Sequence, residues 1–88
     1  MDSQLERIAV VTSGGGLRFD AGIRSHVVHT DQPVASGGDD LAATPLELLA
    51  ASLGACVALY AHQFCARRGI PDEGLRVEVE WEKAQAPY

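Results

Sequence analysis

The sequence predicts an α+β fold in which short antiparallel strands precede one long apolar helix and a further strand follows it. Three patterns support this class: β-prone runs punctuated by glycine before residue 31, helix start and stop signals around residues 45 and 68, and strict apolar–polar alternation over residues 75–82. A chain of 88 residues is long enough for one domain, so we expect a single domain over residues 1–88.

The strands before the helix are expected to begin with a hairpin. Residues 8–12 are β-prone, residues 17–21 alternate between apolar and polar side chains, and a glycine turn at residues 13–16 joins them. A second turn over residues 21–25 leads to a third strand, His26–Thr30. These runs predict a small antiparallel sheet.

Three features in or near these strands bear on a possible nucleotide, metal or other functional site. No nucleotide-binding loop is expected at Gly14–Gly16, because no helix follows and the phosphate-binding lysine is missing. His26 and His29 are three residues apart, so they face opposite sides of a strand and do not form a metal-binding pair. The polar loop Asp31–Ala43 is long for a compact domain, and long loops are often functional.

The central helix has well-marked ends. Thr44 is the predicted N-cap, Pro45 suits the first helical position, and Glu47 completes a capping box. Two arginines in the last turn and the following Gly69 predict the C-terminal end. A helix over Pro45–Arg68 would be roughly 36 Å long at 1.5 Å per residue.

This helix has no polar face. From Leu48 to Ala66 there is no formal charge, which is typical of a helix buried on several sides or one that crosses a membrane. The membrane alternative is disfavoured by the many alanines and by polar residues such as His62, which lower its hydrophobicity. A short chain can hardly enclose such a helix, so we expect an obligate oligomer or part of a longer polypeptide.

Charge and composition narrow the function class. The net charge is −5 and there is no basic patch, so we expect no nucleic-acid partner. The first residues include Asp2, Glu6 and Arg7 without an apolar run, so no signal peptide is expected. Two cysteines in an acidic chain of this kind favour the reducing cytoplasm.

The two cysteines lie on the same helix. Cys56 and Cys65 are nine residues apart, or roughly 13 Å along the axis, which is too far for a disulfide within an intact helix. The spacing also does not suit a CxxC redox motif or a zinc site. His62 could contact Cys65 across one turn, although each cysteine by itself is most often a small buried apolar residue. Thiol chemistry would therefore depend on one cysteine.

The stretch from Gly37 to Cys56 contains GG-D followed by TPLELL-A-LGAC. This pattern resembles the signature of the OsmC/Ohr family, which consists of osmotically inducible and organic-hydroperoxide-resistance proteins. The helix end at Arg67–Pro71 and the strand at residues 74–81 resemble it too, so the likeness covers residues 8–82. It implies a three-stranded sheet, a long buried central helix, further strands and a second helix. It also implies an intertwined homodimer with the central helices packed inside.

The resemblance implies a cysteine-based peroxidase that reduces organic hydroperoxides. The reactive cysteine of the family corresponds to Cys56, whose thiolate would attack the O–O bond. An arginine from an N-terminal strand, typically of the partner chain, would favour the thiolate; Arg18 is the best placement and Arg24 the competitor. The expected partners are a small apolar hydroperoxide and an external thiol reductant, and no metal or organic cofactor is implied.

Three departures from the family pattern favour an alternative function. The family's resolving cysteine lies in a second helix that this sequence does not include, together with the rest of the C-terminal half. Leu46 also stands where peroxidase members carry a glutamate, with Glu47 one position later. The Pro-Leu-Glu-Leu-Leu version resembles the less characterised OsmC-like branch. The sequence is thus expected to be an N-terminal part or a short member, and the alternative is an inactive binding or interaction module.

Overall fold

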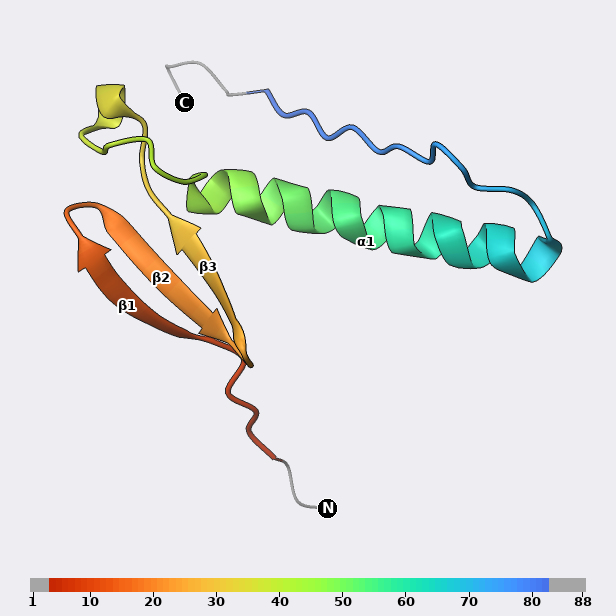
Figure 1. The fold of residues 1–88 in the computed structure, drawn as a ribbon, viewed down its shortest axis with the longest axis horizontal. Helices are drawn as coiled ribbons and strands as arrows, with labels where there is room; N and C mark the ends of the chain where they lie inside the picture. The colour runs from red at the N-terminus through yellow and green to blue at the C-terminus, as the bar shows by residue number, and fades with distance from the viewer. Residues whose placement is uncertain (1–3, 83–88) are drawn as a thin grey trace. The chain divides into compact units, whose positions relative to one another are not determined.

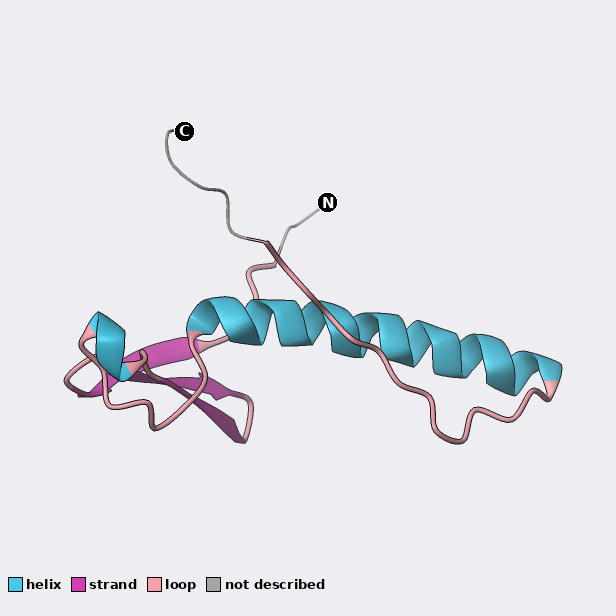
Figure 2. Ribbon diagram, turned by 90° about the horizontal axis from the view of Figure 1, so that it is seen from above, coloured by secondary structure: helices cyan, strands magenta, loops and turns pink. Residues whose placement is uncertain are grey.

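The computed structural model describes residues 4–82, which fall into two compact units that we describe separately. The first unit runs to Pro45, and the second, from Leu46, contains almost the whole long helix (Figures 1 and 2). The elements in chain order are β1 (Val10–Gly15), β2 (Arg18–Ile23), β3 (His26–Thr30), the short 3₁₀ helix η1 (Val34–Ser36) and α1 (Pro45–Arg68).

The first unit contains a three-stranded antiparallel sheet with the order β1-β2-β3 (Figure 1). The central strand β2 pairs on both sides, and its Ala21 lies opposite Val11 of β1 and Val28 of β3. Each strand is thus joined to the next by a hairpin. The predicted sheet before the helix is confirmed.

Both turns are shorter than the sequence suggested. β1 begins two residues later than expected and continues to Gly15, so the first turn contains only Gly16 and Leu17. The register of β1 against β2 shifts between Ser13 and Gly15, which leaves one additional residue in β1 as a bulge. The expected turn at residues 13–16 was therefore too long, because a glycine-rich run can remain in a ladder through a bulge.

The second turn contains only Arg24 and Ser25, with Arg24 at a φ of 54°. The turn predicted at residues 21–25 was too long, because Ala21, Gly22 and Ile23 all pair within the sheet. Small residues on a central strand gain ladder hydrogen bonds from both neighbours, which outweighs their weak strand preference.

The helix α1 has the predicted ends. It begins at Pro45 with Glu47 in its first turn and ends at Arg68, with both arginines in its last turn. Gly69 follows with a φ of 65°, the left-handed conformation expected after a helix. The local end signals in the sequence were sufficient to define this element.

The segment 75–82, predicted as a strand, has no ladder partner among the described residues and is not a strand in this structure. It runs back beside α1 instead (Figures 1 and 2). Its alternating pattern supplies an apolar face, but a strand also needs a neighbour to accept and donate its backbone hydrogen bonds. The expected tail at residues 83–88 lies outside the described residues.

Gly54 allows this returning segment to approach α1 closely. A Cβ atom at Gly54 would lie 2.7 Å from Cγ2 of Val79 and 3.9 Å from Cγ1 of Val77. Gly54 is also the one buried residue of α1. A glycine within an otherwise good helix costs about 1 kcal/mol relative to alanine, so its presence here reflects the space that Val79 occupies.

Replacing Gly54 by alanine is therefore expected to lower the free energy of unfolding by about 1 kcal/mol. Overpacking against Val79 costs roughly 1–3 kcal/mol, and the gain in helix propensity offsets only part of it. Urea unfolding measures the change. The matched double variant Gly54→Ala with Val79→Ala should recover the loss. A single variant more stable than wild type would show that Val79 does not pack on Gly54.

The long helix was predicted to be buried against a second copy of the chain; in the single chain it is largely exposed, and its burial in a dimer stays a prediction. No apolar side chain is buried among residues 4–82, and Leu53 is 60% exposed. Within the second unit, the described residues supply only the returning segment to cover α1. The helix is also long and apolar enough to cross a membrane by length and composition, which for one helix is weak evidence.

All the exposed large apolar residues of α1 except Leu59 form a stripe along the helix. Its members recur at intervals of three or four residues, which places them on one face. We call this face the apolar stripe; it consists of Leu46, Leu49, Leu53, Val57, Tyr60 and Phe64, each at least half exposed.

Candidate functional site

Cys56 is an exposed free thiol on α1. It lies three residues after Leu53 and four before Tyr60, and residues with these spacings are neighbours on a helix surface. The thiol is therefore at the side of the apolar stripe. A surface that covers the stripe would thus lie next to this sulfur.

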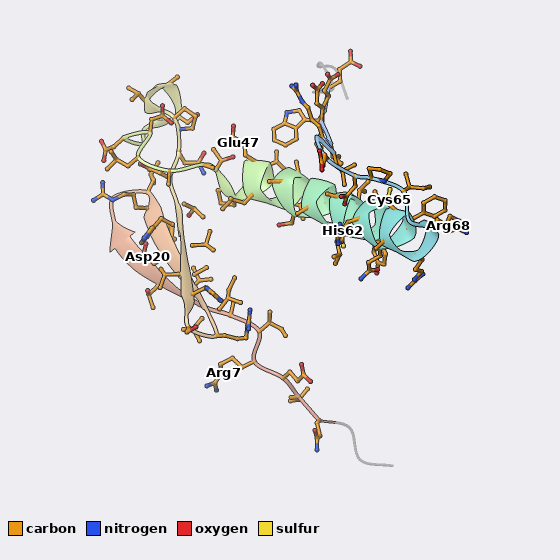
Figure 3. All side chains as sticks on the ribbon, turned by 45° about the vertical axis from the view of Figure 1, so that its right-hand side comes forward. Arg7, Asp20, Glu47, His62, Cys65 and Arg68 are labelled. Atoms are coloured by element: carbon orange, nitrogen blue, oxygen red, sulfur yellow. The ribbon has the colours of Figure 1, made fainter. Side chains whose placement is uncertain are left out.

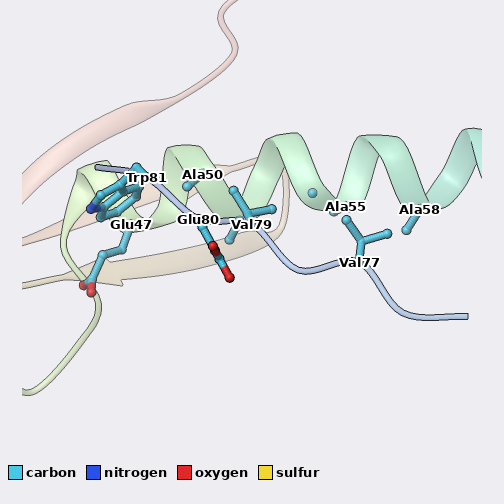
Figure 4. A pocket seen from close by; sticks show the side chains of 10 residues that line it. Glu47, Ala50, Ala55, Ala58, Val77, Val79, Glu80 and Trp81 are labelled. Carbon is cyan, nitrogen blue, oxygen red and sulfur yellow. The ribbon is translucent and has the colours of Figure 1, made fainter. Parts of the chain in front are cut away.

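A groove of about 820 Å³ lies between α1 and the returning segment (Figure 4). Its lining comes from successive turns of one helix face and from the end of the described chain: Glu47, Ala50, Ala51, Gly54, Ala55, Ala58, Val77, Val79, Glu80 and Trp81. Cys56 is not among them, since it lies two residues and about 200° beyond Gly54 around the helix. The groove and Cys56 thus occupy different faces of α1.

Glu47 lines this groove and is therefore not on the face of Cys56. The two residues are nine positions apart, which corresponds to about half a turn of rotation. The neighbouring Leu46 belongs to the apolar stripe, on the side where Cys56 lies. Leu46 stands where the resemblance implies a glutamate in peroxidase members, so that position is apolar in this chain.

Arg18, the predicted activating residue, is held by the loop that follows the sheet. Its Nη1 donates to Oδ2 of Asp39 at 3.0 Å, and its Nη2 donates to the carbonyl oxygen of Gly14 at 3.4 Å. Arg18 belongs to the first unit and Cys56 to the second. Their pairing stays a prediction, as does the alternative with Arg24, which lies at the β2–β3 turn.

Asp31 organises the loop that holds Arg18. This side chain is only 1% exposed and accepts hydrogen bonds from the backbone N–H groups of Gln32 at 2.7 Å, Asp39 at 3.3 Å and Leu41 at 3.0 Å. The hydrogen bond from Leu41 is the main reason that the pKa of Asp31 is lowered; burial opposes it, and the other two bonds and the charge of Arg18 add to the lowering. A carboxylate suits this position because it only accepts hydrogen bonds.

Gly38 completes the same loop by a close approach of two backbone segments. A Cβ atom at this position would lie 2.1 Å from the carbonyl oxygen of Gln32 and 2.8 Å from Oδ1 of Asp31. No side chain fits there. The GG-D part of the motif thus has a structural role in addition to its resemblance to the family signature.

Sequence reasoning marked the loop Asp31–Ala43 as a functional candidate but gave no role to the side chains of Asp31 and Asp39. Asp39 connects the loop to the sheet, because its N–H donates to Asp31 and its carboxylate accepts from Arg18. The available signal was an aspartate directly after a strand, followed by Pro33 and a polar loop, which is a common setting for side-chain hydrogen bonds to the backbone.

Replacing Asp31 by asparagine is expected to lower stability at neutral pH and to flatten its dependence on acid pH. The folded-state pKa of Asp31 is below its ordinary value of 3.8, so its contribution is present above that pH and is lost as the pH falls through the lower folded-state pKa. Urea unfolding at about pH 7 and about pH 2 measures this. The difference between the variant and wild type should shrink at the acid end; an unchanged difference would contradict the role of the charge.

Two of the three histidines contact carboxylates. Nδ1 of His29 on β3 lies 2.6 Å from Oδ1 of Asp20 on β2, and Nδ1 of His62 contacts Oδ2 of Asp72 beyond the end of α1 (Figure 3). Cys65 is half-buried, and its carbonyl oxygen accepts a bond from the N–H of Ile70 at 2.9 Å. Within residues 4–82, no group of three or more His, Cys, Asp or Glu side chains is arranged to hold a metal ion.

Comparison with known proteins agrees with this architecture. One solved structure, an osmotic stress induced and detoxification response protein from Psychrobacter arcticus 273-4, is 29% identical with a TM-score of 0.72. The match covers 81% of this chain and 53% of the other, so the chain spans about half the length of that protein. No curated protein matches. Residues 37–88, more than half of the chain, match the family described as OsmC-like protein. The chain therefore belongs to the OsmC-like family.

Proposed function

We propose that this chain belongs to a thiol-dependent peroxidase that reduces organic hydroperoxides in oxidative stress defence, with Cys56 as the nucleophile. The observation that carries the proposal is an exposed free thiol at Cys56, within the stretch that matches the family. The description of the similar Psychrobacter protein, which names osmotic stress and detoxification, is consistent with it.

In the proposed reaction, the thiolate sulfur of Cys56 attacks the terminal oxygen of the hydroperoxide. The O–O bond breaks, an S–O bond forms, and the alkoxide leaves with a proton as the alcohol, so Cys56 becomes a sulfenic acid while the hydroperoxide is reduced by two electrons. One external thiol then displaces water to give a mixed disulfide, and a second releases the Cys56 thiol as a small disulfide forms. No metal or organic cofactor takes part.

A homodimer would complete the proposed site. The large apolar side chains of the stripe are exposed to water in the single chain. A second copy of α1 would cover them, because large exposed apolar patches mark interaction sites. Because Cys56 lies beside the stripe, the same contact would create an apolar environment around the sulfur, suited to an apolar hydroperoxide. We place this reaction in the cytoplasm, where thiol reductants are available.

Arg18 is the proposed activator of the Cys56 thiolate, from the same chain or its partner. A guanidinium near the sulfur favours the charged form. The ion pair between Arg18 and Asp39 is exposed, so it contributes little to stability. Its proposed role is to orient the guanidinium of Arg18. The chain of contacts from Asp31 through Asp39 would present Arg18 in a fixed direction.

The identity of the reactive cysteine can be tested by trapping. One equivalent of cumene hydroperoxide is added to the reduced protein with dimedone, which captures sulfenic acids, and peptides are analysed by mass spectrometry. The adduct is expected at Cys56 in wild type and in Cys65→Ser, a control on the same helix. An adduct confined to Cys65, or none, would remove Cys56 from the proposed mechanism.

The alternative function is a catalytically inactive binding module. The groove favours it, because its apolar walls and Trp81 lie on a face of α1 that Cys56 does not reach. Leu46 favours it as well, since this leucine stands where the resemblance implies a glutamate in peroxidase members. This alternative predicts that Cys56 reacts with cumene hydroperoxide no faster than free glutathione does at the same pH.

A further inference from the structure

We propose that Tyr60 is a further catalytic residue of the proposed peroxidase, and that its phenol gives a proton to the alkoxide that leaves when Cys56 attacks a hydroperoxide. This role rests on the proposed function, because Tyr60 would act only on the group that this attack releases. Three features of α1 support it: the position of Tyr60, its uncommitted hydroxyl, and the bonds made by other polar groups near Cys56.

Tyr60 lies four residues beyond Cys56 on α1. Residues with this spacing are neighbours on a helix surface, with Cβ atoms about 5–6 Å apart. Long side chains on a helix lean toward its N-terminus, so a tyrosine covers the turn before its own Cα atom. The turn before Tyr60 is the one that carries Cys56. The phenol is therefore expected within reach of an oxidant bound at the sulfur.

The hydroxyl of Tyr60 is available to donate. Tyr60 is 67% exposed, and its hydroxyl makes no hydrogen bond within residues 4–82. A phenol both donates and accepts hydrogen bonds. An alkoxide is a much stronger base than a phenolate, so proton transfer from the phenol to a leaving alkoxide is favourable.

The step balances in atoms and charge. The thiolate sulfur of Cys56 takes the terminal OH group and becomes a sulfenic acid, while the O–O bond breaks and the hydroperoxide is reduced by two electrons. The departing alkoxide takes the proton of Tyr60 and leaves as the alcohol. The remaining phenolate takes a proton from water, which returns Tyr60 to its starting state as a general acid.

A donor is needed here because the proposed dimer would cover the apolar stripe and keep most water from the leaving oxygen. The other polar groups described near Cys56 suit this role less well. Ser52, one turn earlier, donates its hydroxyl to the carbonyl oxygen of Leu48 at 2.8 Å. His62 lies about 120° around the helix from Cys56, and its Nδ1 contacts a carboxylate. Arg18, the proposed activator, does not give up its proton in proteins.

Two oxidants whose leaving groups differ in basicity test this role. Cumene hydroperoxide releases a strongly basic alkoxide, whereas peroxybenzoic acid releases benzoate, which leaves without a proton. In the Cys65→Ser background, the rate of loss of the Cys56 thiol is measured with each oxidant. Tyr60→Phe removes only the hydroxyl. It should slow the reaction with cumene hydroperoxide at least about tenfold and keep the rate with peroxybenzoic acid within about twofold.

Ser52→Ala is the matched control, because it removes a hydroxyl one turn to the other side of Cys56. In this variant the ratio of the two rates should equal that of the Cys65→Ser protein. Circular dichroism verifies that each variant keeps its helix.

Two results would overturn the role of Tyr60 alone. These are an unchanged rate with cumene hydroperoxide in Tyr60→Phe, or an equal loss with both oxidants, which would indicate that Tyr60 positions the sulfur and supplies no proton. In either case Cys56→Ser would still abolish the reaction, and the proposed function would stand. Equal consumption of cumene hydroperoxide by wild type and Cys56→Ser would overturn the proposed function and the role of Tyr60 together.

Discussion

Replacing Cys56 by serine is expected to slow the consumption of cumene hydroperoxide by at least about 100-fold, because a hydroxyl at this position is neither ionised nor a comparable nucleophile. The reaction is followed in a single turnover by stopped flow with the reduced protein. Serine is close in size to cysteine and the side chain is exposed, so the variant should fold as wild type does. The lower rate would thus reflect the missing thiol nucleophile and not a less stable fold.

Cys65→Ser is the matched control for this experiment. Cys65 lies on the same helix, is half-buried, and is nine residues from Cys56. If Cys56 alone is the nucleophile, this variant should keep the wild-type rate within about twofold. Equal rates for wild type and Cys56→Ser would contradict the proposed function, and a loss in the Cys65 variant alone would assign the reaction to the other thiol.

The second large effect is expected at the apolar stripe. Replacing Leu53, which is 60% exposed in the single chain, by glutamate should convert the proposed dimer to monomers. Burial of a leucine contributes about 1.5–3 kcal/mol, and an unpaired carboxylate in its place adds a further penalty in both copies. Sedimentation velocity measures the change in mass.

A control charge on the same helix separates an interface effect from a general effect of glutamate. Ala66 lies on α1 outside the apolar stripe, so Ala66→Glu adds the same charge and should leave the dimer intact. A wild-type chain that is monomeric at about 100 μM, or a Leu53→Glu variant that remains dimeric, would contradict the proposed use of the stripe, because Kd values of stable dimers lie well below that concentration.

The elements that the sequence predicted best are those with local causes. Pro45 and Gly69 mark the ends of α1 through conformational preferences of single residues, and both ends were correct. The strand ends were less accurate, because whether Ser13–Gly15 or Ala21–Ile23 belong to a ladder depends on partners elsewhere in the chain. The same dependence explains why the alternating segment 75–82 is not a strand here.

The candidate site was predicted only in part, and for a similar reason. Cys56 was identified by its resemblance to the family position, whereas by pattern alone it was a small apolar residue. Asp31 was missed because two of its partners, the N–H groups of Asp39 and Leu41, are eight and ten residues away. A loop that folds onto one carboxylate has no periodic pattern that would reveal it.

The most direct test of the central claim is the amount of alcohol formed by the reduced chain with excess cumene hydroperoxide and no added reductant, before any further oxidation of the sulfur. We expect about one cumyl alcohol per chain in the first rapid phase, because each Cys56 transfers two electrons once. Cys56→Ser should yield no rapid phase. A rapid phase of the same size in that variant, or no alcohol from wild type, would contradict the assignment of Cys56 as the peroxidatic thiol.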